Sequence, residues 1–311
     1  MKKNAIFMKT IILAVLFCIL LIDSALGIKL EKQDDFINNS KKAEVFLDAQ
    51  HREQRSRNGI DDAYSEQDFL RYTLRYGFTV SKYLDLTPYF RLHGVHSWSD
   101  TFSFINNIEP GVGIWARPLR PFLNGKNSIC KSLFRNIRTL IEYSPNTYYL
   151  DDPESKSDPE GNLLRLSIDW YGEHGIKHEF LTGYMDLFSQ YRLSENGPKE
   201  ILHWSLRPGI AIDKDDMRLR LYLRWNGSFG FDSREPWNNV HEFGGGLALQ
   251  PFYVKQSSNN DSSMLDKWLS NIRIYIERLS LSYMNRNNDL YLSSQPESYI
   301  RFGIELWYGR E

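Results

Sequence analysis

Cysteine is nearly absent from the 311-residue chain, which holds only Cys18 and Cys130. Cys18 falls inside an apolar N-terminal run, so a chain processed after that run keeps one cysteine and forms no intramolecular disulfide. An excess of basic residues is also missing, because the net charge is −1, and this argues against a nucleic-acid partner. A glycine-rich phosphate-binding loop is absent as well, and no cofactor is predicted.

Long hydrophobic runs are missing after the N-terminus, because charged residues interrupt every later apolar stretch. Residues 1–27 combine a basic start, an apolar run of 13 residues and a small-residue ending, which together predict a secretory signal peptide. A short periplasmic segment is expected at 28–42. With 18 tyrosines, 8 tryptophans and a mean hydropathy of −0.47, the exported remainder fits either a soluble β-rich protein or an outer-membrane barrel.

From about residue 43 onward, apolar and polar side chains alternate with a period of two, as in β-strands. Leu219 and Leu221, for example, fall on one face, whereas Arg218 and Arg220 fall on the other. Strands are predicted in this way near 43–55, 68–80, 83–97, 107–119, 134–144, 161–172, 178–192, 200–212, 217–230, 240–254, 270–284 and 298–309. The first of these segments also fits an amphipathic helix, and that alternative stays open.

Two halves of the chain resemble one another. The stretch NNIEPGVGIWARPLRPF at 106–122 is similar to NNVHEFGGGLALQPF at 238–252, and other matched segments lie at similar offsets. Such internal similarity predicts a tandem duplication of a six-stranded unit. The expected organisation is a single barrel domain at 43–309, built from repeats at 43–172 and 178–309.

The predicted fold class is all-β, an antiparallel up-and-down transmembrane β-barrel of about 12 strands. Alternation persists over about 9–12 residues per strand, the length that a tilted strand needs to cross a bilayer. Aromatic residues such as Trp170, Trp225 and Tyr308 recur towards strand ends, as in interfacial girdles. A soluble β-sandwich with the same alternation is the alternative. Two amphipathic pieces, 128–134 and 263–270, are expected as short helices at the periplasmic rim, where they could plug the barrel.

If the apolar faces point to lipid, the polar faces line the lumen, and the two halves place matching charges there. The predicted lumen charges are Arg75, Arg91, Arg138, Glu142, Arg165, Asp169, Arg207, Arg224, Arg273, Glu277, Arg301 and Glu305. One interpretation is a network of ion pairs that fills a narrow lumen, because a buried charge needs a partner. The other is a cation-lined path that binds an anionic polymer or a lipid headgroup.

No catalytic or metal-binding set of residues is predicted. The enzyme hypothesis is an outer-membrane lipid hydrolase, which needs a Ser–His pair on the lipid-facing wall. The nearest candidate is His96 beside Ser97, and no acidic or amide residue stands by to orient the histidine. We therefore expect a protein without enzymatic activity, and the hydrolase stays as an alternative.

The segment 238–252, followed by a polar loop and NIRIYIERL at 271–279, resembles the C-terminal barrel domain of NfrA-type bacteriophage adsorption proteins. Related barrels occur in exopolysaccharide exporters, and 106–143 shows the pattern nearly as well. The resemblance implies a barrel in the bacterial cell outer membrane, in contact with its lipid. It also implies a conduit or anchor in export of a surface polysaccharide, together with a periplasmic export machinery, or a phage-adsorption receptor. A closed structural or adhesin barrel without transport is the alternative.

Overall fold

The computed structural model describes the barrel wall and part of its rim. The described residues are 41–55, 64–81, 84–98, 106–123, 134, 136–145, 147–149, 161–175, 180–195, 200–214, 216–231, 239–253, 264–283 and 298–309. The predicted signal peptide, the segment up to residue 40 and most of the loops between strands lie outside these residues. The predicted rim piece at 128–134 does too, except for its last residue.

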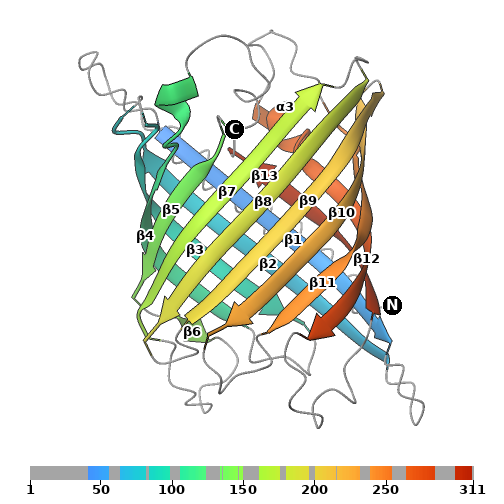
Figure 1. The fold of residues 1–311 in the computed structure, drawn as a ribbon, viewed down its shortest axis with the longest axis horizontal. Coiled ribbons are helices and arrows are strands. Elements are labelled where there is room, and N and C mark those ends of the chain that lie inside the picture. Colours follow the sequence, from blue (N-terminus) through green and yellow to red (C-terminus); the bar gives the residue numbers. More distant parts are fainter. Residues whose placement is uncertain are drawn as a thin grey trace.

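A single antiparallel sheet closes on itself to form the barrel (Figure 1). Its strands are β1 (Lys41–Arg55), β2 (Tyr64–Phe78), β3 (Thr87–Ser97), β4 (Asn107–Ala116), β5 (Arg138–Ser144), β6 (Tyr148–Tyr149), β7 (Leu163–Gly175), β8 (Leu181–Ser194), β9 (Glu200–Lys214), β10 (Met217–Gly230), β11 (Val240–Gln250), β12 (Ile272–Tyr283) and β13 (Ser298–Tyr308). The described helices are η2 (Arg120–Leu123) and α3 (Met264–Leu269).

Neighbours in the sheet follow the order of the chain, and β1 pairs with β13 to close it. The two-residue β6 continues β5 along β4, so the 13 strands occupy twelve positions around the barrel when β5 and β6 are counted as one. The prediction of an antiparallel up-and-down barrel of about 12 strands is confirmed. None of the helices in the described part of the chain is long and apolar enough to cross a membrane.

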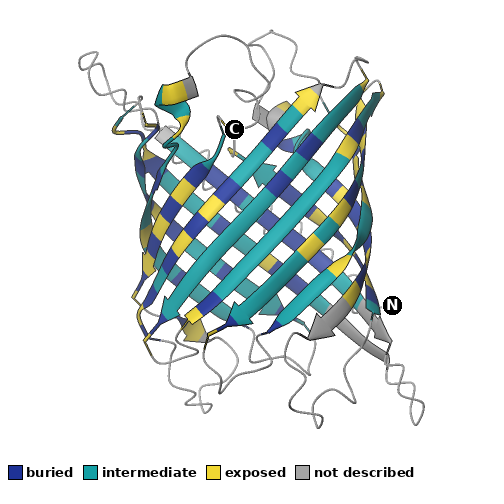
Figure 2. Ribbon diagram, in the orientation of Figure 1, coloured by how far each residue is buried: buried dark blue, intermediate teal, exposed yellow. Residues whose placement is uncertain are grey.

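Buried and exposed residues alternate along strands of the wall (Figure 2), and many of the buried ones are charged while many of the exposed ones are apolar, the reverse of a soluble sandwich. On β5, Arg138 and Glu142 are 2% and 1% exposed, whereas Ile141 between them is 51% exposed. Other exposed apolar side chains around the wall include Phe90, Val112, Leu223, Phe243 and Phe302. Buried arginines beside exposed isoleucines are stable only where the outer surroundings are apolar. The wall therefore spans a membrane, and the sandwich alternative is wrong.

The first predicted strand is a strand and not a helix. β1 pairs with β2 along one edge and with β13 along the other, so it closes the barrel. Glu44 and Asp48 point inward from it, because each contacts a residue of a strand that is not its neighbour. Val45 and Leu47 alternate with them and point outward. The pattern that also suited an amphipathic helix therefore belongs to a pleated strand.

Two matching prolines follow the ends of two strands. β4 ends at Ala116 and β11 ends at Gln250, and Pro118 and Pro251 lie in the turns beyond them. Proline lacks the N–H group that the next ladder bond requires, so neither strand continues through it. Both strands are a few residues shorter than their predicted ranges for this reason.

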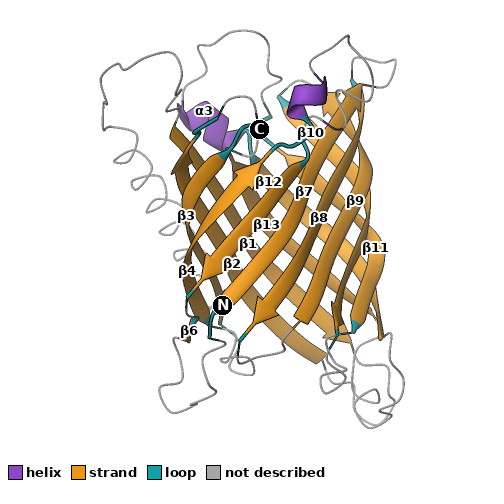
Figure 3. Ribbon diagram, turned by 60° about the vertical axis from the view of Figure 1, so that its left-hand side comes forward, coloured by secondary structure: helices purple, strands orange, loops and turns teal. Residues whose placement is uncertain are grey.

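The predicted amphipathic piece at 263–270 forms α3, at the end of the barrel where β1 begins and β13 ends (Figures 1 and 3). Trp268 is 3% exposed and packs against Val45 and Leu306. Its ring also stacks on Tyr308, with centroids 4.7 Å apart. Val45 and Leu306 face outward, so Trp268 covers the outer wall where the first and last strands meet. The prediction that this piece could plug the barrel is wrong as far as Trp268 is concerned, because that side chain lies outside the lumen.

Replacing Trp268 with alanine should loosen the contact between the first and last strands. The loss of a buried indole is expected to lower the free energy of unfolding by about 3 kcal/mol, measured by urea titration of the barrel in lipid vesicles. Phe122→Ala is the matched control, because Phe122 lies in η2 at 82% exposure and should change stability little. Equal losses in the two variants would contradict a special role for Trp268.

Candidate functional site

Charged side chains inside the barrel reach one another across strands that are not neighbours in the sheet. Arg207 Nη1 on β9 lies 3.3 Å from Glu305 Oε2 on β13, and Arg138 on β5 pairs with Glu44 on β1. Only the interior of the barrel permits such contacts, so these side chains line the lumen. They form three networks, held together by ion pairs, hydrogen bonds and electrostatic interactions among their members.

Glu142 is the centre of the first network. Its Oε1 accepts hydrogen bonds from Tyr89 Oη at 2.8 Å and from Arg75 Nε at 2.9 Å, and Arg91 Nε lies 3.3 Å from Oε2. Further ion pairs add the remaining members. The Glu142 network thus consists of Glu44, Arg75, Tyr89, Arg91, Glu109, Arg138, Glu142, Arg165 and Asp169.

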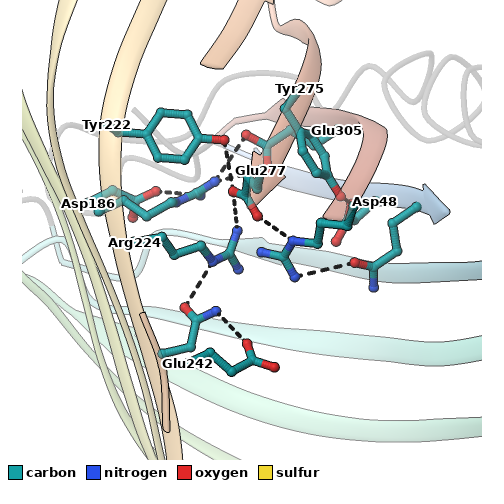
Figure 4. Close-up of polar contacts among 12 residues, drawn as sticks. Asp48, Asp186, Tyr222, Arg224, Glu242, Tyr275, Glu277 and Glu305 are labelled. Carbon is teal, nitrogen blue, oxygen red and sulfur yellow. Dashed lines mark hydrogen bonds and ion pairs between the residues drawn. The ribbon is translucent and has the colours of Figure 1, made fainter. Parts of the chain in front are cut away.

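Glu277 is the centre of the second network (Figure 4). Its Oε1 accepts hydrogen bonds from Tyr222 Oη at 2.8 Å and Arg224 Nη1 at 2.9 Å, and Arg301 Nε donates to Oε2. Ion pairs and hydrogen bonds add members on β1, β10 and β11, and Arg301 lies over the ring of Tyr275, whose hydroxyl donates to Asp48. Arg207 forms ion pairs with Asp186 and Glu305, Arg273 pairs with Glu305, and the charge of Arg207 acts on Glu277 without a hydrogen bond to it. The Glu277 network consists of Asp48, Arg52, Asp186, Arg207, Tyr222, Arg224, Asn226, Glu242, Arg273, Tyr275, Glu277, Arg301 and Glu305.

A third network, the rim network, lies at the α3 end of the barrel and joins Glu173, Asp213, Arg218, Arg220 and Tyr253. Arg218 Nε is 2.6 Å from Asp213 Oδ1, and its Nη1 is 2.8 Å from Glu173 Oε1. Arg220 Nη2 is 3.3 Å from the same Glu173 oxygen. Tyr253 lies beyond the end of β11 and accepts a hydrogen bond from Arg218. Burial raises the pKa of Tyr253 to about 12, although the charge of Arg218 opposes that rise.

The first two networks contain all the lumen charges named from the sequence. Arg75, Arg91, Arg138, Glu142, Arg165 and Asp169 lie in the Glu142 network, and Arg207, Arg224, Arg273, Glu277, Arg301 and Glu305 lie in the Glu277 network. Sequence reasoning missed the rim network because its charges have no counterparts in the first half. The alternation of Arg218 and Arg220 on the polar face of their strand was the signal that could have found it.

Several carboxylates were also missed, among them Glu44, Asp48 and Asp186. Two others, Glu109 and Glu242, occupy matching positions within the repeated stretch. That match could have identified both glutamates as inward charges. It was missed because neither glutamate has a second charge beside it on its strand.

Matching residues of the two halves make matching contacts around each central glutamate. Tyr89 on β3, Gly113 on β4 and Glu142 on β5 stand in register across three consecutive strands. The same order recurs as Tyr222, Gly246 and Glu277 on β10, β11 and β12. In both halves the tyrosine hydroxyl reaches the glutamate across the glycine at 2.8 Å.

The two glycines are needed because the tyrosine rings lie over them. A Cβ atom on Gly113 would come within 2.5 Å of the Tyr89 ring, and one on Gly246 within 2.7 Å of the Tyr222 ring. With a side chain at either position, the ring could not lie flat across the strand and its hydroxyl would miss the glutamate.

The hydrolase candidate is not assembled as a pair. His96 and Ser97 follow one another on β3, so their side chains point to opposite faces of the wall. His96 makes an edge contact with Trp98, while Ser97 is buried. Within the described ranges, no group of three or more His, Cys, Asp or Glu side chains could hold a metal ion.

No protein-family model and no curated protein matches this chain. Among solved structures it is similar to the COG4313 outer membrane channel from Pseudomonas putida F1, with 10% identity, a TM-score of 0.41 and coverage of 90% of this chain and 100% of that one. Salmonella typhi OmpF has 9% identity and a TM-score of 0.36, with coverage of 90% of this chain and 100% of that one. The NanC porin has 10% identity and a TM-score of 0.36, with coverage of 84% of this chain and 98% of that one. Likenesses this weak assign no function, and the resemblance to NfrA-type barrels is not confirmed.

The architecture itself defines the class of protein. A closed antiparallel barrel leaves no strand edge unpaired, and this one carries an apolar outer wall and a charged interior. That is how β-strands cross the bacterial outer membrane. The chain is therefore an outer-membrane β-barrel, in the location predicted from its sequence.

Neighbouring glycines allow a matched test of the tyrosine packing. Gly246→Ala should destabilise the barrel by about 1–3 kcal/mol, because the new methyl group overpacks against the Tyr222 ring. Gly245→Ala should be nearly neutral, because its Cβ would meet only the Tyr222 carbonyl oxygen at 3.4 Å. Urea titration in vesicles measures both, and a larger loss for Gly245→Ala would refute the packing role of Gly246.

Removing a central carboxylate should cost far more than removing its tyrosine partner. Glu277→Gln leaves Arg224 and Arg301 buried with an uncompensated charge, and a loss of about 3–5 kcal/mol is expected. Tyr222→Phe deletes one hydrogen bond from a carboxylate that keeps its arginines, with an expected loss of about 1–2 kcal/mol. Glu142→Gln should behave like Glu277→Gln. Unfolding titrations that rank Tyr222→Phe as the most damaging would contradict this order.

Proposed function

We propose that the barrel is a narrow conduit for charged, water-soluble molecules across the outer membrane. The observation that carries the proposal is the exposure of Arg71. This residue shares the inward face of β2 with Thr73 and Arg75, yet its side chain is exposed. Water inside the barrel is the medium that can reach an inward side chain in the middle of a membrane-spanning strand. Its exposure therefore supports a hydrated lumen.

The wall opposite the Glu142 network is consistent with such a path. The inward side chains of Gln190 on β8, of His203 and Ser205 on β9, and of Arg224 on β10 are all half-buried. Members of the Glu142 network such as Arg138 are almost completely buried. This contrast supports a water path along β8, β9 and β10, with the Glu142 network packed along the other side.

The narrower form of the proposal is export of an acidic surface polysaccharide, handed to the barrel by a periplasmic machinery. Its support is the resemblance of 106–143 and 238–279 to exopolysaccharide-export and phage-adsorption barrels, together with the many arginines of the lumen. A receptor role for bacteriophage would depend on the outer loops, which lie outside the described residues.

A closed structural barrel is the second candidate, and one observation favours it. The arginines of the Glu142 network are tied to carboxylates on strands around the wall, which resembles the packed core of a small barrel more than the open lumen of a porin. The two candidates differ in whether ions pass.

Planar-bilayer recording separates them. The wild-type protein should give small conductance steps, and Ser205→Trp should reduce them, because the indole enters the lumen beside the half-buried wall. Ser189→Trp is the matched control: Ser189 pairs near Trp204 on the outward face of β8 and β9, so its indole faces lipid. A wild-type barrel without conductance would sink the conduit and leave the closed barrel.

A further inference from the structure

Each of the three networks sets one carboxylate against each arginine. The Glu142 network opposes Arg75, Arg91, Arg138 and Arg165 to Glu44, Glu109, Glu142 and Asp169. The Glu277 network opposes Arg52, Arg207, Arg224, Arg273 and Arg301 to Asp48, Asp186, Glu242, Glu277 and Glu305. The rim network opposes Arg218 and Arg220 to Glu173 and Asp213. Arg71 is a further inward arginine that belongs to none of these balanced sets.

Arg71 has a carboxylate opposite it but makes no ion pair with it. Asp48 is its partner in the β1–β2 ladder, and the Asp48 carboxylate instead accepts a hydrogen bond from Tyr275 Oη at 2.7 Å. Among the described residues, none forms a hydrogen bond with Arg71 or an ion pair within 4.0 Å. The five N–H donors of this guanidinium therefore face the lumen.

Other charged groups act on Arg71. The charge of Asp48 acts on it most strongly, the charges of Arg301 and Arg224 act in the opposite sense, and Arg301 Nη2 is a buried donor without a hydrogen-bond partner in the described part of the chain. The charge of Arg71 also acts on two imidazoles, those of His93 on the neighbouring strand β3 and of His203 on β9. His93 is held by Thr73 at 2.8 Å. Among the side-chain charges that act most strongly on Arg71, two arginines stand against the one carboxylate of Asp48, and a surplus of positive charge in a confined lumen attracts anions.

We propose that Arg71 is the centre of an oxyanion-binding site in the lumen, which takes a carboxylate or phosphate group of a hydrophilic molecule. The planar guanidinium can hold two oxygens of such a group at once, and the charges of Arg301 and Arg224 add positive potential at it. With this site, the proposed conduit prefers acidic solutes to neutral ones. The site rests on that function only because the ligand must enter through the lumen.

Equilibrium dialysis at low ionic strength, with the full barrel in non-ionic detergent, tests the site directly. Two radiolabelled probes, glucuronate for a carboxylate and inorganic phosphate, identify which oxyanion is preferred. The wild-type protein should bind one of them saturably. Arg71→Gln should weaken that binding by on the order of tenfold or more, and Arg71→Lys should retain part of it. Arg278→Gln is the matched control, because Arg278 is an exposed arginine on the outward face of β12.

Three results would overturn the site: no saturable binding of either probe, unchanged binding in Arg71→Gln, or equal loss in Arg278→Gln. Folding of each variant is checked by the folded band on unheated gels. Arg71→Gln leaves every network intact, so it should fold. Failure of the conduit is distinguishable, because a barrel that binds glucuronate or phosphate without passing current removes the conduit and keeps the site. A barrel that conducts ions but binds neither probe removes the site and keeps the conduit.

Discussion

The burial of two glutamates inside the barrel is the constraint on which the rest of the structure depends. Glu142 and Glu277 are withdrawn from water, and a carboxylate in that position costs several kcal/mol unless charged donors surround it. Those donors come from strands one to three places away around the wall, so the networks tie the strands of each half together. A slip of one residue in any ladder would turn an arginine towards lipid. Charge burial therefore enforces register throughout the barrel.

Register and lumen shape are then two results of one arrangement. Where arginines and carboxylates match, side chains pack and water is excluded, as along β3, β4 and β5. Where smaller or unmatched polar residues face inward, as with Ser205 and Arg71, water is admitted. The barrel thus combines a rigid polar core with a hydrated path beside it. A conduit built in this way owes its selectivity to the few charges that the core leaves unbalanced.

Much of this arrangement follows from alternation in the sequence. The period of two located every barrel strand except the two-residue β6, and it placed Arg138 and Glu142 on the inward face, because a strand allows only two faces. Alternation could not identify which charges form ion pairs. Arg138 and Glu142 share a face, yet Arg138 pairs with Asp169 and Glu44, because the ion pairs depend on how strands far apart in the chain are arranged. The glycines of the repeated stretch are visible in the sequence, but only the pairing of strands shows that tyrosine rings lie over two of them.

The paired asparagines that open each repeated stretch are a similar case. Asn106 and Asn239 each accept a hydrogen bond from the backbone nitrogen of the residue that ends the preceding strand, Ser97 and Gly230 respectively. Sequence comparison detects that these residues recur. It does not show that each one joins the ends of two strands across a loop, because that contact exists only once the hairpin has formed.

The position of Trp268 has a consequence for how the barrel can be observed as it assembles. Its ring packs on Val45 from the first strand and stacks on Tyr308 from the last strand. These two strands are in contact only when the cylinder is closed. The chain therefore carries an optical marker at the junction of its first and last strands, which closes the cylinder. A change in indole emission from this site would time closure separately from the pairing of all the other hairpins.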